Sequence, residues 1–364
     1  MAETFGSFYC GKRVLVTGHT GFKGGWLTEW LKLLGARVTG FALPPNTRPN
    51  LFDVIALDRG MTSIFGDVRD RNALAGVLAD HQPEILIHNA GQSSSAKSRR
   101  DPVETYAVNV MGAVHILEEA RYIRPLRCVV VVSTWSAGDG SPSQEQEDSA
   151  ENRVSDSTPL GSSRSCTESV TAAYRYSFFS ELRSAALASL RSGEAIGGGD
   201  WAEHRLIPEL VRAISGDEPL VIRRPDFIYR CEHVLESVRA CLMLAQRLHE
   251  EGQTHAGPWS LGPSDENALT VQQVAKRIVG EWGKGELVVQ ADSQPSLATN
   301  GKAESFISGT RNVRPLSGWK PLLTLDQALT WTVEWYREYY RDRAAAWRTT
   351  QEQIARYTDL IDDH

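Results

Sequence analysis

The chain has 364 residues, of which 41% are hydrophobic and 23% charged, a composition typical of a globular protein with one large domain or two smaller ones. Its formal net charge of −6 provides no general attraction to nucleic acid or to an anionic membrane, so we expect neither as a partner. Its five cysteines show no CxxC spacing and no clustering with histidine, so the sequence predicts no metal site and no disulfide framework. With no signal sequence and no apolar run long enough to span a bilayer, the expected location is the cytoplasm.

The first half of the chain alternates short apolar strands with helical segments. Strands are predicted over 12–18, 36–43, 62–68, 84–91, 127–134 and 186–192. Helices are predicted over 26–35, 71–80, 103–122 and 165–186. Because the strands are apolar on both faces, they predict an α/β fold in which helices cover both sides of a doubly wound parallel sheet.

The second half is less regular. A polar stretch over 139–158 predicts a solvated loop, and beyond "GGGDW" (197–201) the alternation of strand and helix is lost. We expect a smaller domain there, built from parts of 197–364. The region 325–357 is amphipathic and predicts a long helical segment whose packing face carries Trp331, Val333, Trp335 and Tyr339.

The segment "VTGHTGFKG" places Gly18, Gly21 and Gly24 between the first predicted strand and its helix. Glycine permits a tight turn there, and N–H groups at the start of the helix bind a pyrophosphate, so the segment predicts a dinucleotide site. An ordinary strand–helix turn is the alternative. The expected cofactor-binding residues are Gly18, Thr20, Gly21, Phe22, Lys23, Gly24, Asp67, Val68, Asn89, Ala90, Gly91 and Asn109.

Within this set, Asp67 follows a strand, where its carboxylate can accept a hydrogen bond from an adenine amino group, or it caps the next helix. The second predicted strand ends "GFALPP", without the acidic residue that binds the ribose 2′-hydroxyl of NAD. We therefore expect NAD but leave NADP open, since Arg48 could accommodate a 2′-phosphate.

Long segments in both halves resemble the CDP-glucose 4,6-dehydratases, a branch of the extended short-chain dehydrogenase/reductases. They are "TGHTGFKGGWL", "GFALPPNT", "NLFDVI", "DPVETYAVNVMGAVHILEEAR", "IGGGDWAEHRLIPELVRA", "EHVLESV" and "LGPSDENA". The resemblance implies a Rossmann domain over 1–196 that binds NAD(P). It implies a mainly substrate-binding domain over 197–364, with some segments returning to the sheet. It also implies a CDP-linked nucleotide sugar and a homodimer formed through helices like 103–122 and 165–183.

Members of that family oxidise C4 of the sugar with NAD, eliminate water across C5 and C6, and return the hydride to C6. The resemblance assigns proton transfer at C4 to a tyrosine four residues before a lysine, helped by a serine or threonine. It assigns the elimination to an acidic residue with a neighbouring lysine. In this chain Ser133 and Thr134 fill the hydroxyl positions, but Trp135 and Ser136 replace the acidic residue and its lysine.

The tyrosine and lysine positions are Leu160 and Arg164. Leucine has no proton to exchange, and arginine stays charged, so Arg164 can at best orient a ribose or polarise an oxygen.

The substrate side of the resemblance also departs from the family. An asparagine becomes Glu194 and an arginine becomes Tyr229, with Arg230 one residue further on and therefore on the opposite face of a strand. Trp201, Arg205 and His233 still match.

Three hypotheses follow. The chain is an ordinary nucleotide-sugar dehydratase, a relative that binds NAD(P) and a nucleotide sugar without the family's chemistry, or an enzyme with reassigned residues. Candidates for reassignment are Ser133, Arg164, Glu194, Glu232 and His233, although His233 also suits a packing role and Glu232 a solvated charge. Cys166 could act as a nucleophile, but without a base partner it suits packing better. The substitutions favour the second hypothesis.

Overall fold

The computed structural model describes residues 4–134, 158–181, 184–261, 268–290, 314–316 and 318–362. The predicted loop 139–158 lies outside this part of the chain except for Thr158, which caps a helix. No helix within these residues is both long and apolar enough to cross a membrane.

A parallel sheet forms the centre of the molecule. In sheet order, its strands among the described residues are β15 (Arg314–Pro315), β12 (Gly257–Ser260), β7 (Ala186–Ser192), β6 (Cys128–Thr134), β5 (Ile85–His88), β2 (Arg13–Thr17), β3 (Arg37–Ala42) and β4 (Thr62–Phe65). All their pairings are parallel. The order reverses between β2 and β5, which makes this a doubly wound sheet with a switch point at β2. The predicted α/β class is confirmed.

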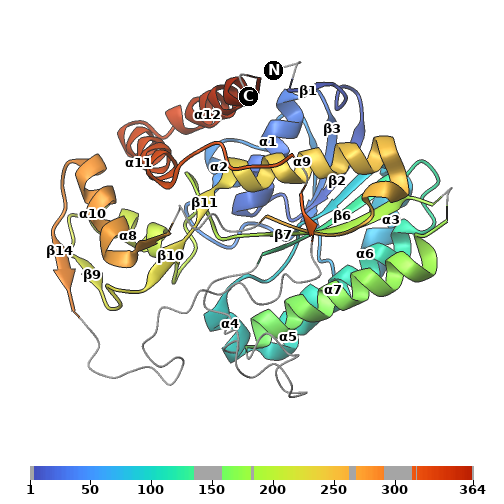
Figure 1. Cartoon of the computed structure of the whole chain (residues 1–364), viewed down its shortest axis with the longest axis horizontal. Helices are drawn as coiled ribbons and strands as arrows, with labels where there is room; N and C mark the ends of the chain where they lie inside the picture. Colours follow the sequence, from blue (N-terminus) through green and yellow to red (C-terminus); the bar gives the residue numbers. More distant parts are fainter. Residues whose placement is uncertain are drawn as a thin grey trace.

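Helices cover both faces of this sheet (Figure 1). On one face lie α1 (Phe22–Leu33), α9 (Val234–Glu251), α11 (Leu325–Arg341) and α12 (Ala345–Asp362). On the other face lie α3 (Arg71–His81), α6 (Gly112–Ala120) and α7 (Pro159–Phe178). Each face buries its own apolar cluster, which explains why the strands are apolar on both sides.

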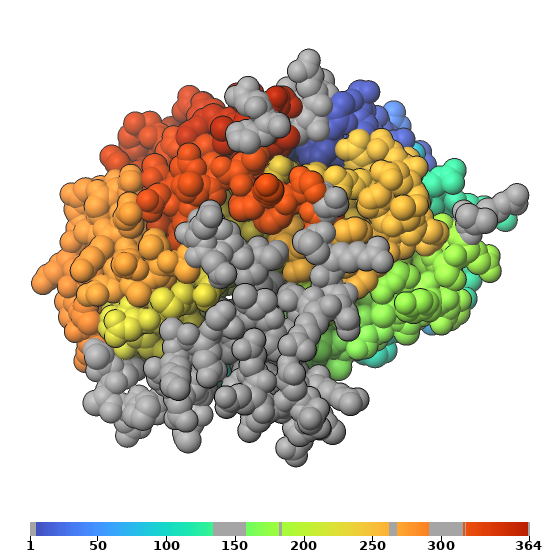
Figure 2. Space-filling model, in the orientation of Figure 1, coloured from blue at the N-terminus to red at the C-terminus, as the bar shows by residue number. Residues whose placement is uncertain are grey.

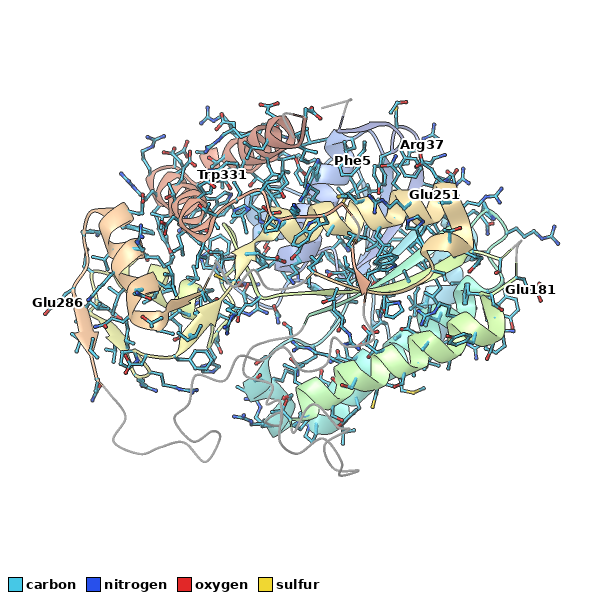
Figure 3. All side chains as sticks on the ribbon, viewed as in Figure 1. Phe5, Arg37, Glu181, Glu251, Glu286 and Trp331 are labelled. Atoms are coloured by element: carbon cyan, nitrogen blue, oxygen red, sulfur yellow. The ribbon has the colours of Figure 1, made fainter. Side chains whose placement is uncertain are left out.

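A smaller region extends from one end of the sheet. It contains α8 (Leu206–Ser215), α10 (Val271–Trp282) and two short two-stranded sheets, in which β9 (Leu220–Ile222) pairs with β14 (Leu287–Val289) and β10 (Ile228–Arg230) with β13 (Ala268–Thr270). In Figure 3, Glu286 marks its outer end and Glu181 the opposite end of the molecule. Strands β12 and β15 return from the second half of the chain to the large sheet, whereas the domain boundary at 196/197 stays a prediction.

Several predicted helices differ in their limits, and the one predicted over 26–35 is α1 (Phe22–Leu33). The one predicted over 165–186 spans Pro159–Phe178, because the Thr158 hydroxyl accepts from the Gly161 N–H and proline occupies the first turn. The one predicted over 103–122 is α5 (Pro102–Tyr106), a π-helical turn (Ala107–Met111) and α6. The long C-terminal segment breaks at Asp342, whose extended backbone ends α11.

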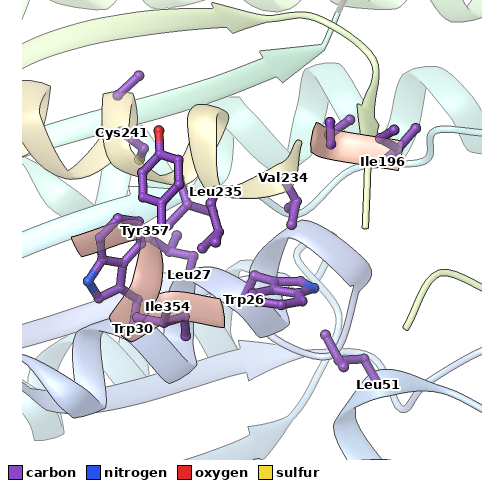
Figure 4. Close-up of a cluster of buried hydrophobic side chains, with 14 of the residues drawn as sticks. Trp26, Leu27, Trp30, Leu51, Ile196, Val234, Leu235, Cys241, Ile354 and Tyr357 are labelled. Carbon is purple, nitrogen blue, oxygen red and sulfur yellow. The ribbon is translucent and has the colours of Figure 1, made fainter. Parts of the chain in front are cut away.

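Aromatic side chains fill the interface between α1, α9 and α12 (Figure 4). Trp26 and Trp30 of α1 are fully buried, and the Trp30 ring meets the Tyr357 ring of α12 edge to face, with centroids 5.7 Å apart. The Trp26 indole N–H donates to the Gly198 carbonyl at 2.9 Å, which ties α1 to the "GGGDW" turn. Burial of each such aromatic stabilises the fold by several kcal/mol, on the order of 3–5 as judged by truncation to alanine.

A buried carboxylate holds the C-terminal helix in place. Glu236 of α9 is fully buried, and its Oε2 accepts from the Tyr357 hydroxyl at 2.5 Å. Its Oε1 accepts the N–H groups of Leu322 and Leu323 at 2.8 and 2.9 Å. Burial raises the pKa of Glu236, while these donors and the neighbouring Arg239 favour its ionised form.

The substitution Tyr357→Phe removes one donor from this buried carboxylate while keeping the ring in the core. We expect a loss of about 1–3 kcal/mol in the free energy of unfolding, the usual cost of an unsatisfied buried group. Urea denaturation followed by tryptophan fluorescence measures it, with Tyr340→Phe, at an exposed position of α11, as the control. Equal stability of the two variants would contradict this role for Glu236.

Candidate functional site

The glycine-rich turn between β2 and α1 lies at the switch point of the sheet. Gly18 has φ +79°, and a Cβ built on it would lie 2.8 Å from the Ala90 backbone. A Cβ on Gly24 would lie 2.0 Å from the Gly18 carbonyl oxygen. Both positions therefore require glycine, because backbone segments meet there without room for a side chain.

The first turn of α1 fits a pyrophosphate. Its N-cap is Gly21, which makes no capping side-chain hydrogen bond, and α1 has no acidic residue in its first turn. A helix start of this kind offers N–H groups and a positive partial charge to an anion. The residues present at this turn thus fit a bound dinucleotide.

Several predicted cofactor residues meet beside this turn. Ala90 and Gly91 follow β5 next to Gly18, and the Asn89 and Ala90 N–H groups both donate to the Thr17 hydroxyl at 3.2 Å. Asn109 lies in the π-helical turn, where its Oδ1 accepts the Gln92 N–H at 2.7 Å.

The Asn109 amide also donates to the Ser163 hydroxyl of α7 at 2.9 Å. Asn109 therefore connects the loop after β5 to the helix that carries Leu160 and Arg164. Short π-helical turns are frequent at functional sites.

Asp67, the residue predicted to bind the adenine, already has a hydrogen-bond partner in Arg69. Asp67 follows β4 in a turn, and its carboxylate accepts from Arg69 Nε at 2.9 Å and from Arg69 Nη2 at 2.5 Å. These hydrogen bonds lower the pKa of Asp67. A carboxylate has about four lone-pair sites, so Asp67 keeps the capacity to accept from an adenine amino group as well. Val68 is buried against Gly112.

The remaining turn residues point in different directions. The Thr20 hydroxyl donates to the Leu43 carbonyl after β3 at 2.9 Å. Phe22 packs against the apolar core. The Lys23 ammonium leaves the turn and donates to Ser192 Oγ at 2.8 Å and to the Gly193 carbonyl at 3.1 Å, at the carboxyl end of β7. The sequence predicted Lys23 as a cofactor-binding residue but did not indicate that its side chain points toward the end of β7.

The positions that the resemblance assigns to catalysis lie at the carboxyl end of β6 and the start of α7. Leu160, in the first turn of α7, is 1% exposed, and Arg164, one helical turn further on, is partly buried. Ser133 lies at the end of β6, where its carbonyl is 3.5 Å from Ser192 Oγ. Thr134 ends β6, and Trp135 and Ser136 lie outside the described residues.

A small cavity opens at the carboxyl ends of β7 and β8 (Ala195–Ile196). Its polar lining consists of Glu194, Asp200, Arg205 and Tyr229. Tyr229 donates to Glu194 Oε1 at 3.2 Å, and Arg205 Nη1 donates to Asp200 Oδ2 at 2.9 Å. Burial raises the pKa of both Glu194 and Tyr229.

Two departures from the family pattern, Glu194 and Tyr229, thus pair with each other. Arg205 also donates to Ser93 Oγ at 3.0 Å, which joins this cavity to the loop after β5. Ser93 and Asp200 were missed as site residues, and only the polar "GGGDW" motif could have indicated Asp200.

The other predicted substrate residues lie around this cavity in different settings. Arg230 and Tyr229 alternate along β10, so their side chains point to opposite faces of the strand. Trp201 is buried against the rings of Trp335, Tyr336 and Tyr339.

His233 lies between the rings of Trp26 and Trp331, the latter from α11. Burial lowers the pKa of His233 to about 3, and its Nδ1 accepts the Leu235 N–H at 3.4 Å. The imidazole is therefore neutral and caps α9.

Glu232, in β11 (Glu232–His233), is the carboxylate with the most distinctive environment. It is partly buried, and its Oε1 accepts from the Ser237 hydroxyl at 2.5 Å. Burial raises its pKa to about 7, the range in which a general acid or base works best at neutral pH.

The chain matches the model of the NAD dependent epimerase/dehydratase family over residues 14–257. It is 36% identical over 350 residues to a CDP-glucose 4,6-dehydratase of Salmonella typhimurium, covering 92% of this chain and 93% of that protein. It is 29% identical over 154 residues to a dTDP-L-rhamnose 4-epimerase of Burkholderia thailandensis, covering 39% and 42% of the two chains.

Among solved structures, the fold is similar to a UDP-glucose 4-epimerase of Thermotoga maritima, with a TM-score of 0.71 at 19% identity over 90% of this chain and 99% of that one. It is also similar to a dTDP-glucose 4,6-dehydratase of Bacillus anthracis solved in complex with NAD, with a TM-score of 0.67 at 20% identity over 93% and 100% of the chains. Because the family model covers more than half of the residues and the Salmonella relative nearly all of them, the chain belongs to the NAD dependent epimerase/dehydratase family.

Proposed function

We propose that this protein binds NAD and a nucleotide sugar, with CDP as the nucleotide, but does not turn the sugar over as a 4,6-dehydratase. The glycine turn and the first turn of α1 support the dinucleotide, and the Salmonella relative supports the CDP-linked sugar. NAD is favoured by the family and by relatives solved with NAD, although the chain lacks an acidic residue at the end of β3. The cytoplasmic location stays a prediction.

The observation that carries the loss of turnover is Leu160. Oxidation at C4 requires a group that removes the hydroxyl proton, and the position that the resemblance assigns to that group holds a buried hydrocarbon side chain. Loss of one positioned acid or base typically lowers the rate by about 10² to 10⁴. Arg164 cannot replace it, because a guanidinium does not exchange its proton near neutral pH.

Reassigned chemistry is the second candidate, and Glu232 is the observation that favours it. A partly buried carboxylate with a pKa near 7, close to Lys23 and Arg239, suits a general acid or base. Turnover of a ligand retained on purification, abolished in Glu232→Gln, would support this alternative over a binding role.

We expect the purified protein to bind NAD or NADP and to form no 4-keto-6-deoxy product from CDP-glucose, as measured by mass spectrometry. The combined substitutions Leu160→Tyr, Arg164→Lys, Trp135→Asp and Ser136→Lys restore the family's proton carriers. Detectable product from this variant, with unchanged dinucleotide affinity, supports the proposal. Sustained product formation by the unmodified protein contradicts it.

The dinucleotide site itself is tested by Gly24→Ala. The added methyl group meets the Gly18 carbonyl oxygen and displaces the turn, so we expect NADH affinity to fall by at least about tenfold. Fluorescence titration with NADH measures this. Gly76→Ala, on α3 where a Cβ meets nothing within 4 Å, serves as the control. Unchanged affinity in Gly24→Ala, with a native circular dichroism spectrum, would place the dinucleotide elsewhere.

A homodimer through α5, α6 and α7 is part of the proposal. Large apolar side chains are exposed on these helices, among them Val103 and Tyr176, which are 77% and 78% exposed. In Figure 2 the surface over α7, in light green, lies open along one margin of the molecule. Large apolar side chains exposed on neighbouring helices support an interface with another protein chain.

The double substitution Val103→Asp with Tyr176→Asp is expected to convert a dimer into a monomer, because two buried carboxylates per subunit would remain unpaired. Analytical ultracentrifugation measures the mass. Val221→Asp, at an exposed position of β9, is the matched control and should leave the mass unchanged. A monomeric unmodified protein, or a dimer that survives the double substitution, would refute this interface.

A further inference from the structure

Lys23 places a partly buried cation between two parts of the candidate site that are far apart in the sequence. It belongs to the first turn of α1, yet its ammonium bonds to Ser192 and Gly193 at the end of β7. In the sheet, β7 is separated from β2 by β5 and β6. The side chain therefore crosses from the glycine turn to the opposite half of the sheet's carboxyl edge.

The groups around this ammonium come from four further segments. Its charge interacts with Glu232 of β11, with Glu194 after β7, with Arg205 before α8 and with Arg164 of α7. Ser192, its hydrogen-bond acceptor, also approaches the Ser133 carbonyl of β6. Lys23 thus lies among the residues that sequence reasoning assigned to hydride transfer and sugar binding.

The strand order of the large sheet indicates which half of a bound dinucleotide would lie near the Lys23 ammonium. A dinucleotide lies across the switch point with its pyrophosphate at the start of α1. In this sheet the adenosine half would lie over β3 and β4, which Asp67 follows, and the nicotinamide half would lie over β5, β6 and β7. The Lys23 ammonium is on that nicotinamide side.

We propose that Lys23 sets the site's preference between the two redox forms of the dinucleotide, favouring NADH over NAD⁺. The oxidised nicotinamide ring carries a positive charge and the reduced ring is neutral, so a fixed ammonium nearby disfavours only the oxidised form. This inference rests on the proposed function, since it requires that the protein bind the dinucleotide.

A purely structural role would have a different signature. If Lys23 only fastened the glycine turn to β7, its removal would weaken NAD⁺ and NADH binding by the same factor. A role at the pyrophosphate would also affect both forms equally, because both carry the same two phosphates. The ratio of the two dissociation constants therefore isolates the electrostatic effect on the ring.

The charge of Lys23 depends on pH in an accessible range. Burial lowers its pKa to about 8, opposed by the attraction of Glu232. An ammonium is charged below its pKa, so the preference for NADH is present near pH 7 and declines as the pH rises through about 8. Glu232 and Glu194 interact with the same ammonium, and its removal in Lys23→Met also raises the pKa of Glu232. Lys23→Arg, which keeps the positive charge, is therefore the matched comparison at each pH.

The experiment measures dissociation constants for NAD⁺ and NADH by calorimetry, at about pH 7 and about pH 9.5. The variants are Lys23→Met, Lys23→Arg and the control Lys12→Met. Lys12 lies just before β2, at the amino ends of the strands and away from the glycine turn. At about pH 7 we expect the NADH preference to fall about tenfold in Lys23→Met and to persist in Lys23→Arg and Lys12→Met. At about pH 9.5 the unmodified protein should match Lys23→Met, while Lys23→Arg keeps the higher preference.

Equal weakening of both forms in Lys23→Met, or no change in the ratio, would overturn the inference while leaving the proposed function intact. An unmodified protein that binds neither form would instead refute the proposed function.

Discussion

The site depends on the close approach of two backbone segments at Gly18. The chain leaves β2, turns with a positive φ against the Ala90 backbone, and enters α1 with Gly24 packed on the Gly18 carbonyl. This contact puts the start of α1 at the switch point of the sheet, where an anion can reach it. It also places Lys23 in the first turn of α1, from which its ammonium reaches Ser192 at the end of β7. A single steric constraint therefore helps to position both the candidate phosphate site and the Lys23 ammonium.

In the cavity at the carboxyl ends of β7 and β8, the charged side chains pair with neighbouring groups. Arg205 pairs with Asp200, and Glu194 accepts from Tyr229. A guanidinium already paired with a carboxylate attracts a diphosphate less strongly than an unpaired one, because the two opposite charges cancel at a distance. The cavity thus retains hydrogen-bonding groups but has little net positive charge.

Much of the fold was predictable because its signals are local. Strands apolar on both faces predicted the parallel sheet, and the glycine spacing predicted the turn at Gly18. Helix limits were less predictable: Thr158 caps α7 earlier than the apolar periodicity suggests, and Asp342 ends α11 inside a continuous amphipathic pattern. Caps and breaks depend on single side-chain bonds, which periodicity does not report.

The sequence suggested candidate site residues but not the pairings among them. Sequence reasoning identified Glu194, Arg205 and Lys23, yet the partners of these side chains come from distant segments: Tyr229, Ser93 and Ser192. His233 is a further example, because its match to the family did not indicate that two tryptophan rings, Trp26 and Trp331, enclose it. Only the tertiary fold brings such partners together.

The central claim is that a dinucleotide-binding site has been kept while the proton carrier beside it has been lost. The most direct measurement is the absorbance at the NADH wavelength when a stoichiometric amount of CDP-glucose is mixed with the NAD-loaded protein. We expect both ligands to bind and no NADH signal to develop, because Leu160 removes no proton from the C4 hydroxyl. A prompt rise in NADH absorbance would show that oxidation at C4 proceeds and that another group carries the proton.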